Sequence, residues 1–166
     1  MNIATILTFE SPVGPLLLGE AGGQVCLCDW IKSKNHDAKV KNIAHRLQVS
    51  LHKGSNPTLL MATEQLQEYF EGQRTEFDLP VAMCGTNFQK EVWRQLLRVQ
   101  YGTTDTYAHI AHAIGRPTAV RAVANAIGAN PISIIVPCHR IIGSDGSLTG
   151  YAGGLKAKQY LLALER

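Results

Sequence analysis

Cys138 and His139 stand side by side in the stretch "ISIIVPCHRIIG", residues 132–143. A thiolate is a strong nucleophile and an imidazole is a base that works near neutral pH, so the pair could attack an electrophilic carbon. Neighbouring side chains, however, point to opposite faces of a strand and diverge by about 100° on a helix. We therefore expect a bridging water or an unusual turn, with a third group that orients the ring. The alternative is a buried structural cysteine beside an unrelated histidine.

The residues on either side of the pair favour the nucleophile. Pro137 fixes the backbone φ directly before Cys138, and it follows an Asn-Pro turn and an apolar run. Downstream, "GSDGSLTGYAGG" places five glycines within residues 143–154. A loop of this composition can close tightly on a flat ligand, and it is equally typical of a glycine-rich hairpin. The context predicts a rigid support for Cys138 beside a pocket-forming loop.

The remaining cysteines give no sign of a metal or cofactor site. The chain has four cysteines, and they include no CxxC pair and no companion His or Asp at a spacing typical of zinc ligands: Cys26, Cys28, Cys84 and Cys138. No apolar run approaches the roughly 20 residues of a membrane helix, and the N-terminus lacks the pattern of a secretory signal. We expect free thiols, no metal, no membrane partner and a cytoplasmic location, associated with the nucleoid if the protein is bacterial.

The first half of the chain reads as a small mixed domain. Apolar runs alternate with turn residues over the first thirty residues, which predicts an antiparallel meander of three short strands. Helical spacing follows at residues 40–47 and again at 59–70, where Gly72 ends the second helix. The segment "RTEFDLPVAMCG" has no helical period. We therefore expect an N-terminal supporting domain over residues 1–80, a linker over 81–85 and a second domain over 86–166.

The second half changes to helices and to positive charge. Thr86 can cap a helix over "NFQKEVWRQLLRV", and two shorter helical segments follow, separated by "GRP". Residues 1–85 carry 7 Lys/Arg against 9 Asp/Glu, whereas residues 86–166 carry 9 against 4, which gives −2 and +5. A basic half suggests a polyanionic partner. The two short helices fit a helix-turn-helix and an ordinary helical hairpin about equally well.

The second of these short helices is rich in alanine and carries few side chains that could read a base. Only Arg121 and Asn125 could reach a base edge, whereas sequence-specific proteins usually commit several polar side chains to bases. Small side chains would let the backbone approach DNA closely. If this helix binds DNA, it should do so with little sequence preference.

The stretch "PCHRIIGSDGSLTGYAGGLKAKQYLLALE", preceded by "RAVANAIGANPISIIV", closely resembles the O6-alkylguanine-DNA alkyltransferases, also called methylated-DNA–protein-cysteine methyltransferases. "GTNFQKEVWRQL" is similar to a helix of the same family, so the resemblance covers residues 85–165 almost without gaps. It implies an α+β fold: a small N-terminal antiparallel sheet with helices, and a mostly helical C-terminal domain with a winged helix-turn-helix. It also implies irreversible transfer of an alkyl group from O6 of guanine to one cysteine, without a cofactor.

The resemblance assigns roles to individual residues. Cys138 would accept the alkyl group, His139 would act as base through a water, and Glu165 would hold the far ring nitrogen. Asn130 would tie the helix-turn-helix to the active-site segment, and the Tyr107 hydroxyl would lie near guanine N3. The base pocket would be lined by Ile141, Tyr151 and Ala152. The DNA-contacting residues would be Arg121, which fills the space of the extruded base, with Thr106, Ala119, Ala122 and Ala126 on the docking surface.

The implied partner is double-stranded DNA that contains O6-alkylguanine, bound through its minor groove by a monomer with little regard to sequence. O4-alkylthymine is a second candidate substrate. Three rival interpretations remain: a DNA-binding regulator, a cysteine hydrolase, and a relative that binds damage but has lost transfer. The regulator would not need Cys138, the hydrolase would turn over without Arg121, and the third conflicts with the retained Cys138, His139, Tyr107 and Glu165.

Overall fold

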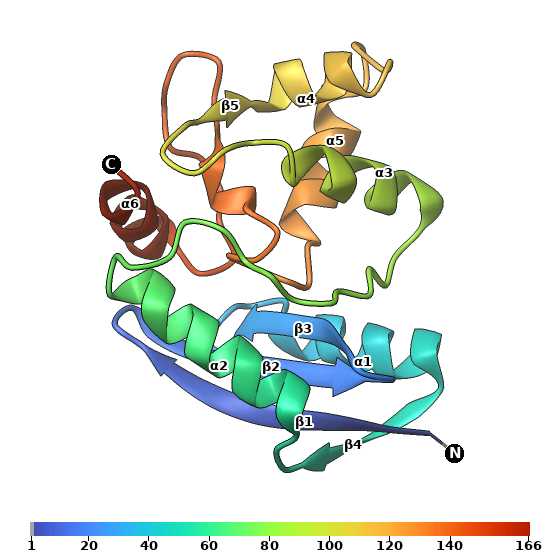
Figure 1. Ribbon diagram of the computed structural model, residues 1–166. Helices are drawn as coiled ribbons and strands as arrows, with labels where there is room; N and C mark the ends of the chain where they lie inside the picture. Colours follow the sequence, from blue (N-terminus) through green and yellow to red (C-terminus); the bar gives the residue numbers. More distant parts are fainter. Residues whose placement is uncertain (1) are drawn as a thin grey trace. The chain divides into compact units, whose positions relative to one another are not determined.

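The computed structural model describes residues 2–166, and these form two compact units, one ending at Cys84 and one from Gly85 to Arg166 (Figure 1). The first unit is a sheet with two helices, and the second is mainly helical. The mixed α+β class predicted from the sequence is thereby confirmed.

The sheet of the first unit has four strands in the order β3-β2-β1-β4. The three-stranded meander is confirmed: β1 (Asn2–Ser11), β2 (Gly14–Ala21) and β3 (Gln24–Trp30) pair antiparallel. Gly22 and Gly23 both have positive φ between β2 and β3, as a two-residue hairpin turn of this hand requires. The strand β4 (Val49–Lys53) was not predicted from the sequence; it pairs parallel with β1, which makes the sheet mixed rather than purely antiparallel.

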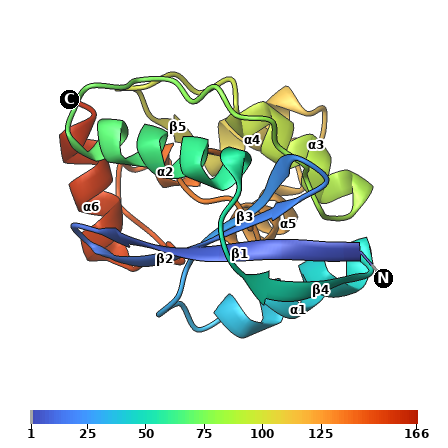
Figure 2. The same cartoon turned by 60° about the horizontal axis from the view of Figure 1, so that its bottom comes forward.

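Two helices cover opposite faces of this sheet, as Figures 1 and 2 show together. Both were predicted: α1 (His36–Leu47) packs Ile43 against Cys26 and Leu27, and α2 (Pro57–Phe70) stacks Phe70 on Phe9 with ring centroids 6.2 Å apart. The side chain of Asn56 accepts the Leu59 N–H at the start of α2, and Pro57 follows at the first helical position.

A buried ionic cluster joins β3 to α1. The carboxylate of Asp29 is wholly buried and lies 2.8 Å from His36 Nδ1 and 3.2 Å from Lys39 Nζ. A buried charge is tolerated when it is paired in this way. Further along the chain, Val25 donates to the Pro80 carbonyl and accepts from Ala82, so the start of the predicted linker is hydrogen-bonded to β3.

The second unit is built around three helices that pack on one another: α3 (Asn87–Leu96), α4 (Tyr107–Ala113) and α5 (Val120–Gly128). Thr86 caps α3 as predicted, because its hydroxyl accepts the Gln89 N–H while the Gln89 side chain accepts the Thr86 N–H. The indole of Trp93 donates to the Ala126 carbonyl at 2.8 Å and so ties α3 to α5.

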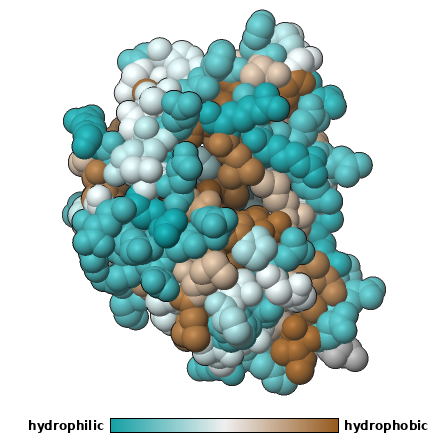
Figure 3. Space-filling view, in the orientation of Figure 1, coloured by the Kyte–Doolittle hydropathy of each residue, from teal (hydrophilic) through white to brown (hydrophobic). Residues whose placement is uncertain are grey.

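The rest of the second unit carries the Cys138 segment. Cys138 itself lies in the 3-10 turn η1 (Cys138–Arg140), which leads directly into the very short strand β6 (Ile141–Ile142). This strand pairs parallel with β5 (Asp105–Thr106), and the last helix is α6 (Leu155–Leu164). Every residue from Asn130 to Ile141 is buried. In the space-filling view hydrophilic residues predominate and apolar ones form small separate groups (Figure 3).

Candidate active site in the second unit

The backbone before Cys138 consists of two very tight turns. Ile135 donates to the Ser133 carbonyl at 2.8 Å across Ile134, whose φ is 71°, and Cys138 donates to the Val136 carbonyl at 2.8 Å across Pro137. A positive φ is unusual for a β-branched residue and costs roughly 1–3 kcal/mol. Such a conformation persists only where the surroundings impose it. The segment before Cys138 is therefore a chain of hydrogen-bonded turns rather than a strand, a conformation in keeping with the rigid support predicted from the sequence.

Asn130 imposes much of this conformation. Its side-chain amide donates to the carbonyls of Ile132 at 3.4 Å and Val136 at 3.0 Å, and its side-chain oxygen accepts the Ile132 N–H at 3.0 Å. Asn130 is almost wholly buried and follows directly on the C-terminal end of α5. One side chain thus links the end of α5 to the backbone two residues before Cys138, in the place that the sequence analysis assigned to it.

Cys138 and His139 lie in the 3-10 turn η1, where successive side chains diverge by about 120°. The ring of His139 is wholly buried, and its Nε2 lies 2.6 Å from Glu165 Oε2. An ionised carboxylate can only accept hydrogen bonds, so Nε2 carries the proton and a neutral ring has its lone pair on Nδ1. That Nδ1 is buried and has no hydrogen-bond partner among residues 2–166. The geometry leaves Nδ1 as a base.

Burial keeps this base uncharged. Desolvation lowers the pKa of His139 below its usual value of 6.5, and the nearby cations Arg140 and Lys158 lower it further, while Glu165 acts in the opposite direction. The first of these effects dominates because a charged imidazole inside the protein loses its hydration. His139 is therefore neutral at physiological pH and able to take up a proton.

Two buried cations near His139 were not singled out from the sequence. Arg140 bonds both oxygens of Glu165, and Lys158 Nζ donates to the carbonyls of Ile141 at 2.5 Å and Thr149 at 2.9 Å. Burial lowers the pKa of Lys158, while Cys138 acts to raise it. A sequence signal for Lys158 existed, because it shares one face of α6 with Leu161 at i+3 and Glu165 at i+7.

The residues predicted to line a base pocket all belong to this region. Ile141 is buried at the end of η1, whereas Tyr151 and Ala152 are half-buried in the loop before α6. The hydroxyl of Tyr107, at the start of α4, donates to the carbonyl of Thr149 at 3.2 Å. Tyr107 and Lys158 thus hold the same carbonyl of the glycine-rich loop.

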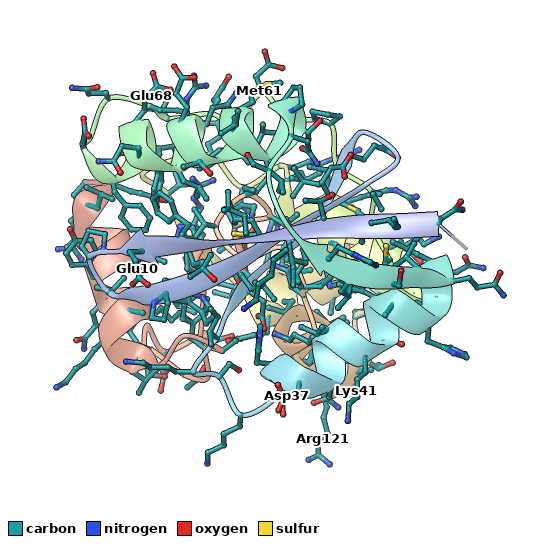
Figure 4. The ribbon with its side chains drawn as sticks, turned by 90° about the horizontal axis from the view of Figure 1, so that it is seen from below. Glu10, Asp37, Lys41, Met61, Glu68 and Arg121 are labelled. Carbon is teal, nitrogen blue, oxygen red and sulfur yellow. The ribbon has the colours of Figure 1, made fainter. Side chains whose placement is uncertain are left out.

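The predicted DNA-facing residues do not all lie on the surface. Arg121 and Ala122 are exposed on α5, and Figure 4 shows Arg121 extending away from the ribbon. Ala119 precedes α5 and is half-buried, and the hydroxyl of Thr106 accepts the His109 N–H at the start of α4. Ala126 has only 3% of its surface exposed and its carbonyl accepts the Trp93 indole N–H, so it belongs to the core and cannot line a docking surface.

Residues 2–166 contain neither a cluster of metal-ligating side chains nor a helix suited to crossing a membrane. No three His, Cys, Asp or Glu side chains in this range come close enough together to hold a metal ion. None of the helices in the same range combines the length and the apolar composition that crossing a membrane requires.

Comparison with known proteins matches both units to one family. Residues 6–83 match the family model described as the ribonuclease-like domain of 6-O-methylguanine DNA methyltransferase, and residues 87–166 match the DNA binding domain of the same protein. A methylated-DNA–protein-cysteine methyltransferase of Methanosarcina barkeri is 46% identical over 159 residues, which cover 94% of this chain and 93% of the relative. The constitutive enzyme of that name from Bacillus subtilis is 42% identical and aligns over 100% of this chain and 96% of its own.

Solved structures agree with the sequence matches. The crystal structure of the Mycobacterium tuberculosis O6-methylguanine methyltransferase superimposes with a TM-score of 0.82 at 41% identity, covering 98% of this chain and 92% of the other. A structure of the same protein in complex with DNA gives the same TM-score and coverage. The chain belongs to the family of methylated-DNA–protein-cysteine methyltransferases.

Proposed function

We propose that this protein repairs alkylated DNA by transferring an alkyl group from O6 of guanine to Sγ of Cys138. The observation that carries the proposal is the buried His139, which is bonded to Glu165 through Nε2 and keeps Nδ1 available next to a buried cysteine. The relatives that share 40–46% of its residues over most of the chain bear the name methylated-DNA–protein-cysteine methyltransferase.

The transfer needs one proton to move and one bond to be exchanged. A water between Cys138 and His139 passes the thiol proton to Nδ1, because the two side chains diverge in η1. The sulfur then attacks the alkyl carbon: the S–C bond forms, the C–O6 bond breaks, and its electron pair goes to the guanine. The guanine takes up one proton from a hydrogen-bond donor beside it; that donor regains a proton from solvent and His139 releases the thiol proton to solvent, so the protons balance. The product is a thioether with no hydrolytic exit, so each molecule reacts once and needs no cofactor.

The leaving guanine gains electron density, and Tyr107 is the proton donor that we assign to it. The Tyr107 hydroxyl now donates to the Thr149 carbonyl, which also accepts from Lys158 Nζ. Turning the hydroxyl towards N3 of a bound base would leave that carbonyl with one donor rather than none. Ile141, Tyr151 and Ala152 would enclose the base.

We infer that the base leaves the stack before it reacts, because Cys138 is buried and cannot enter a duplex. Exposed Arg121 would occupy the vacated space, and exposed Ala122 would permit close approach through the minor groove. The surplus of positive charge over residues 86–166 supports contact with phosphates that does not depend on sequence. The similar M. tuberculosis protein has been crystallised in complex with DNA. We propose that one copy of the chain suffices.

The test is intact-mass analysis after mixing the protein with a duplex containing one O6-methylguanine. The expected result is that one methyl group replaces one hydrogen, that the addition maps to Cys138, and that it is absent from Cys138→Ala. Cys26→Ala, which removes another buried thiol, should still react. Unchanged mass of the parent protein would refute transfer, and retained binding of the damaged duplex would then support a protein that recognises damage without repairing it.

A further inference from the structure

The guanidinium of Arg140 binds the same carboxylate, Glu165, that is bonded to His139. Arg140 has only 6% of its surface exposed, and three of its nitrogen atoms have hydrogen-bond partners. Nε donates to Glu165 Oε1 at 2.8 Å, one terminal nitrogen donates to Glu165 Oε2 at 3.1 Å, and the other donates to the Val99 carbonyl at 2.7 Å. A planar guanidinium that grips both oxygens of a carboxylate fixes the rotation of that carboxylate.

The oxygen that meets His139 is one of the two that Arg140 holds. Glu165 Oε2 accepts from His139 Nε2 at 2.6 Å and from Arg140 at 3.1 Å, and Oε1 accepts from Arg140 and, at 3.5 Å, from the Gly102 N–H. The direction in which Glu165 faces the imidazole is therefore set by Arg140. Because Glu165 lies at the end of α6 and Arg140 lies in η1, the same contact joins these two elements.

Arg140 is itself held in place. Besides the bond to the Val99 carbonyl, its Cζ lies 5.7 Å from the centre of the Tyr101 ring, and the Tyr101 hydroxyl donates to the Leu164 carbonyl at 3.3 Å. An exposed arginine would lose much side-chain entropy on forming such a fork, whereas this one is ordered by contacts on several sides. A side chain that is fixed in this way can orient its partner.

We propose that Arg140 is a positioning residue for the alkyl transfer: it holds the ionised Glu165 carboxylate against Nε2 of His139 and keeps the imidazole uncharged until the thiol gives up its proton. The proposal rests on the transfer to Cys138 put forward above. In this proposal Arg140 acts on the reaction through Glu165 and His139.

The charges around His139 make the direction of the effect clear. The charged groups that act on it are the Glu165 carboxylate and the cations Arg140 and Lys158. Arg140 lowers the pKa of His139 by its positive charge, and it also shares the charge of Glu165, which raises that pKa. Removing Arg140 therefore favours the protonated ring on both counts. A ring protonated on Nδ1 cannot accept the thiol proton.

The experiment compares Arg140→Met, Arg140→Lys and Arg140→Gln with the parent protein. Single-turnover methyl transfer from the O6-methylguanine duplex is measured from about pH 5 to 9, and carbamidomethylation of Cys138 by iodoacetamide is followed by mass over the same range. For Arg140→Met we expect transfer at pH 7 to be at least tenfold slower. The acidic limb of its pH–rate profile, where the rate falls as the pH drops, should move to higher pH by roughly one unit. Arg140→Lys restores the limb but only part of the rate, because it keeps the charge and loses the fork.

Several outcomes would decide against the proposal. If Arg140→Met folds and the acidic limb of its pH–rate profile coincides with that of the parent, Arg140 has only a structural role, however slow the variant is. If Arg140→Met does not fold, Arg140→Gln, which removes the charge but keeps donors, must show the shifted limb. Arg74→Met, which removes an Arg–Glu pair from the first unit, is the matched control and should leave both profiles unchanged.

The two assays also separate this proposal from the one on which it rests. A parent protein that takes no methyl group from DNA would refute alkyl transfer, yet its iodoacetamide profile would still report the proton equilibrium of Cys138 and His139. An unshifted iodoacetamide profile in folded Arg140→Met would overturn the role of Arg140 while leaving methyl transfer by the parent intact.

Discussion

The side-chain amide of Asn130 donates to the carbonyl of Val136 at 3.0 Å, and this bond joins the end of α5 to the tight turns that carry Cys138. The segment between the two residues includes Ile134 with its φ of 71°. Asn130 thus compensates, through three hydrogen bonds, for a backbone conformation that is unfavourable by itself.

Replacing Asn130 by Ala should destabilise the second unit strongly. The substitution leaves the buried Ile132 N–H without its acceptor and removes a donor from two buried carbonyls, and each unsatisfied group costs roughly 1–3 kcal/mol. Urea unfolding followed by circular dichroism measures the loss. Asn125→Ala, on the exposed side of α5, is the control and should change the free energy of unfolding little. Equal losses in the two variants would contradict this view of Asn130.

The buried neutral His139 should make the protein less stable in mild acid. Its pKa in the folded state lies below the usual 6.5, so the unfolded chain binds more protons between the two values and the free energy of unfolding falls as the pH drops below about 6.5. His139→Gln should flatten this part of the curve, whatever its overall stability. Thermal midpoints from about pH 7 to 5 provide the measurement, and His45→Gln on exposed α1 should keep the slope of the parent. The same slope in His139→Gln would show that other groups cause it.

Cys26 should remain an unreactive thiol in the folded protein. Burial raises its pKa to about 12, with a further contribution from Cys84, so almost no thiolate is present at pH 8. Mass spectrometry after brief iodoacetamide treatment at pH 8 should find no label on Cys26, and full label once the chain is unfolded in urea. Native labelling of Cys26 as fast as that of Cys138 would mean that burial does not protect it.

Arg121 should matter for duplex DNA and not for the chemistry itself. We expect Arg121→Ala to slow methyl transfer from a duplex by roughly tenfold or more, because opening a base pair without a replacement costs a few kcal/mol. Reaction with free O6-methylguanine should be unchanged. Arg94→Ala, an equally exposed cation on α3, serves as the control. If both substrates are affected alike by Arg121→Ala, insertion into the base stack is not the role of this side chain.

Alkylation should destabilise the protein. Cys138 has 6% of its surface exposed and is mounted on rigid turns, so an added methyl group must displace close neighbours at a cost of about 1–3 kcal/mol. Differential scanning calorimetry of the free and the methylated protein should show a lower midpoint after reaction. Equal midpoints would indicate that the pocket has room for the product.

Local pattern was sufficient for most of the fold but not for every element. Short stretches of sequence were enough to predict the hairpin glycines, the capping box at Thr86 and the apolar stripes of α1, α2 and α3. The strand β4 was missed because its five residues, "VSLHK", are half-exposed, and only their pairing with β1 makes them a strand. Ala126 was misplaced because an alanine fits a close-packed helix contact and a docking surface equally well.

The candidate site, too, could be predicted from local sequence only in part. The adjacency of Cys138 and His139 in the sequence was enough to argue against direct contact of their side chains and to call for a third group. That Glu165 is this group cannot be read from spacing, since it lies 26 residues from His139 and only folding brings the two together. Arg140 was overlooked because a charged residue beside a histidine is usually a solvated side chain, and its partners Val99 and Glu165 lie far from it in sequence.

The distances along the chain have a consequence for when the protein becomes reactive. His139 meets Glu165 across 26 residues and Arg140 meets Val99 across 41, so we expect these contacts to form late in folding, after the local turns and helices. Until then Cys138 has no base placed to take up its proton, and a thiol without such a base is mostly protonated at neutral pH and slow to react. If each molecule acts once, as proposed above, its thiol would be protected from stray electrophiles during synthesis, and the contacts that form last in folding would make it reactive.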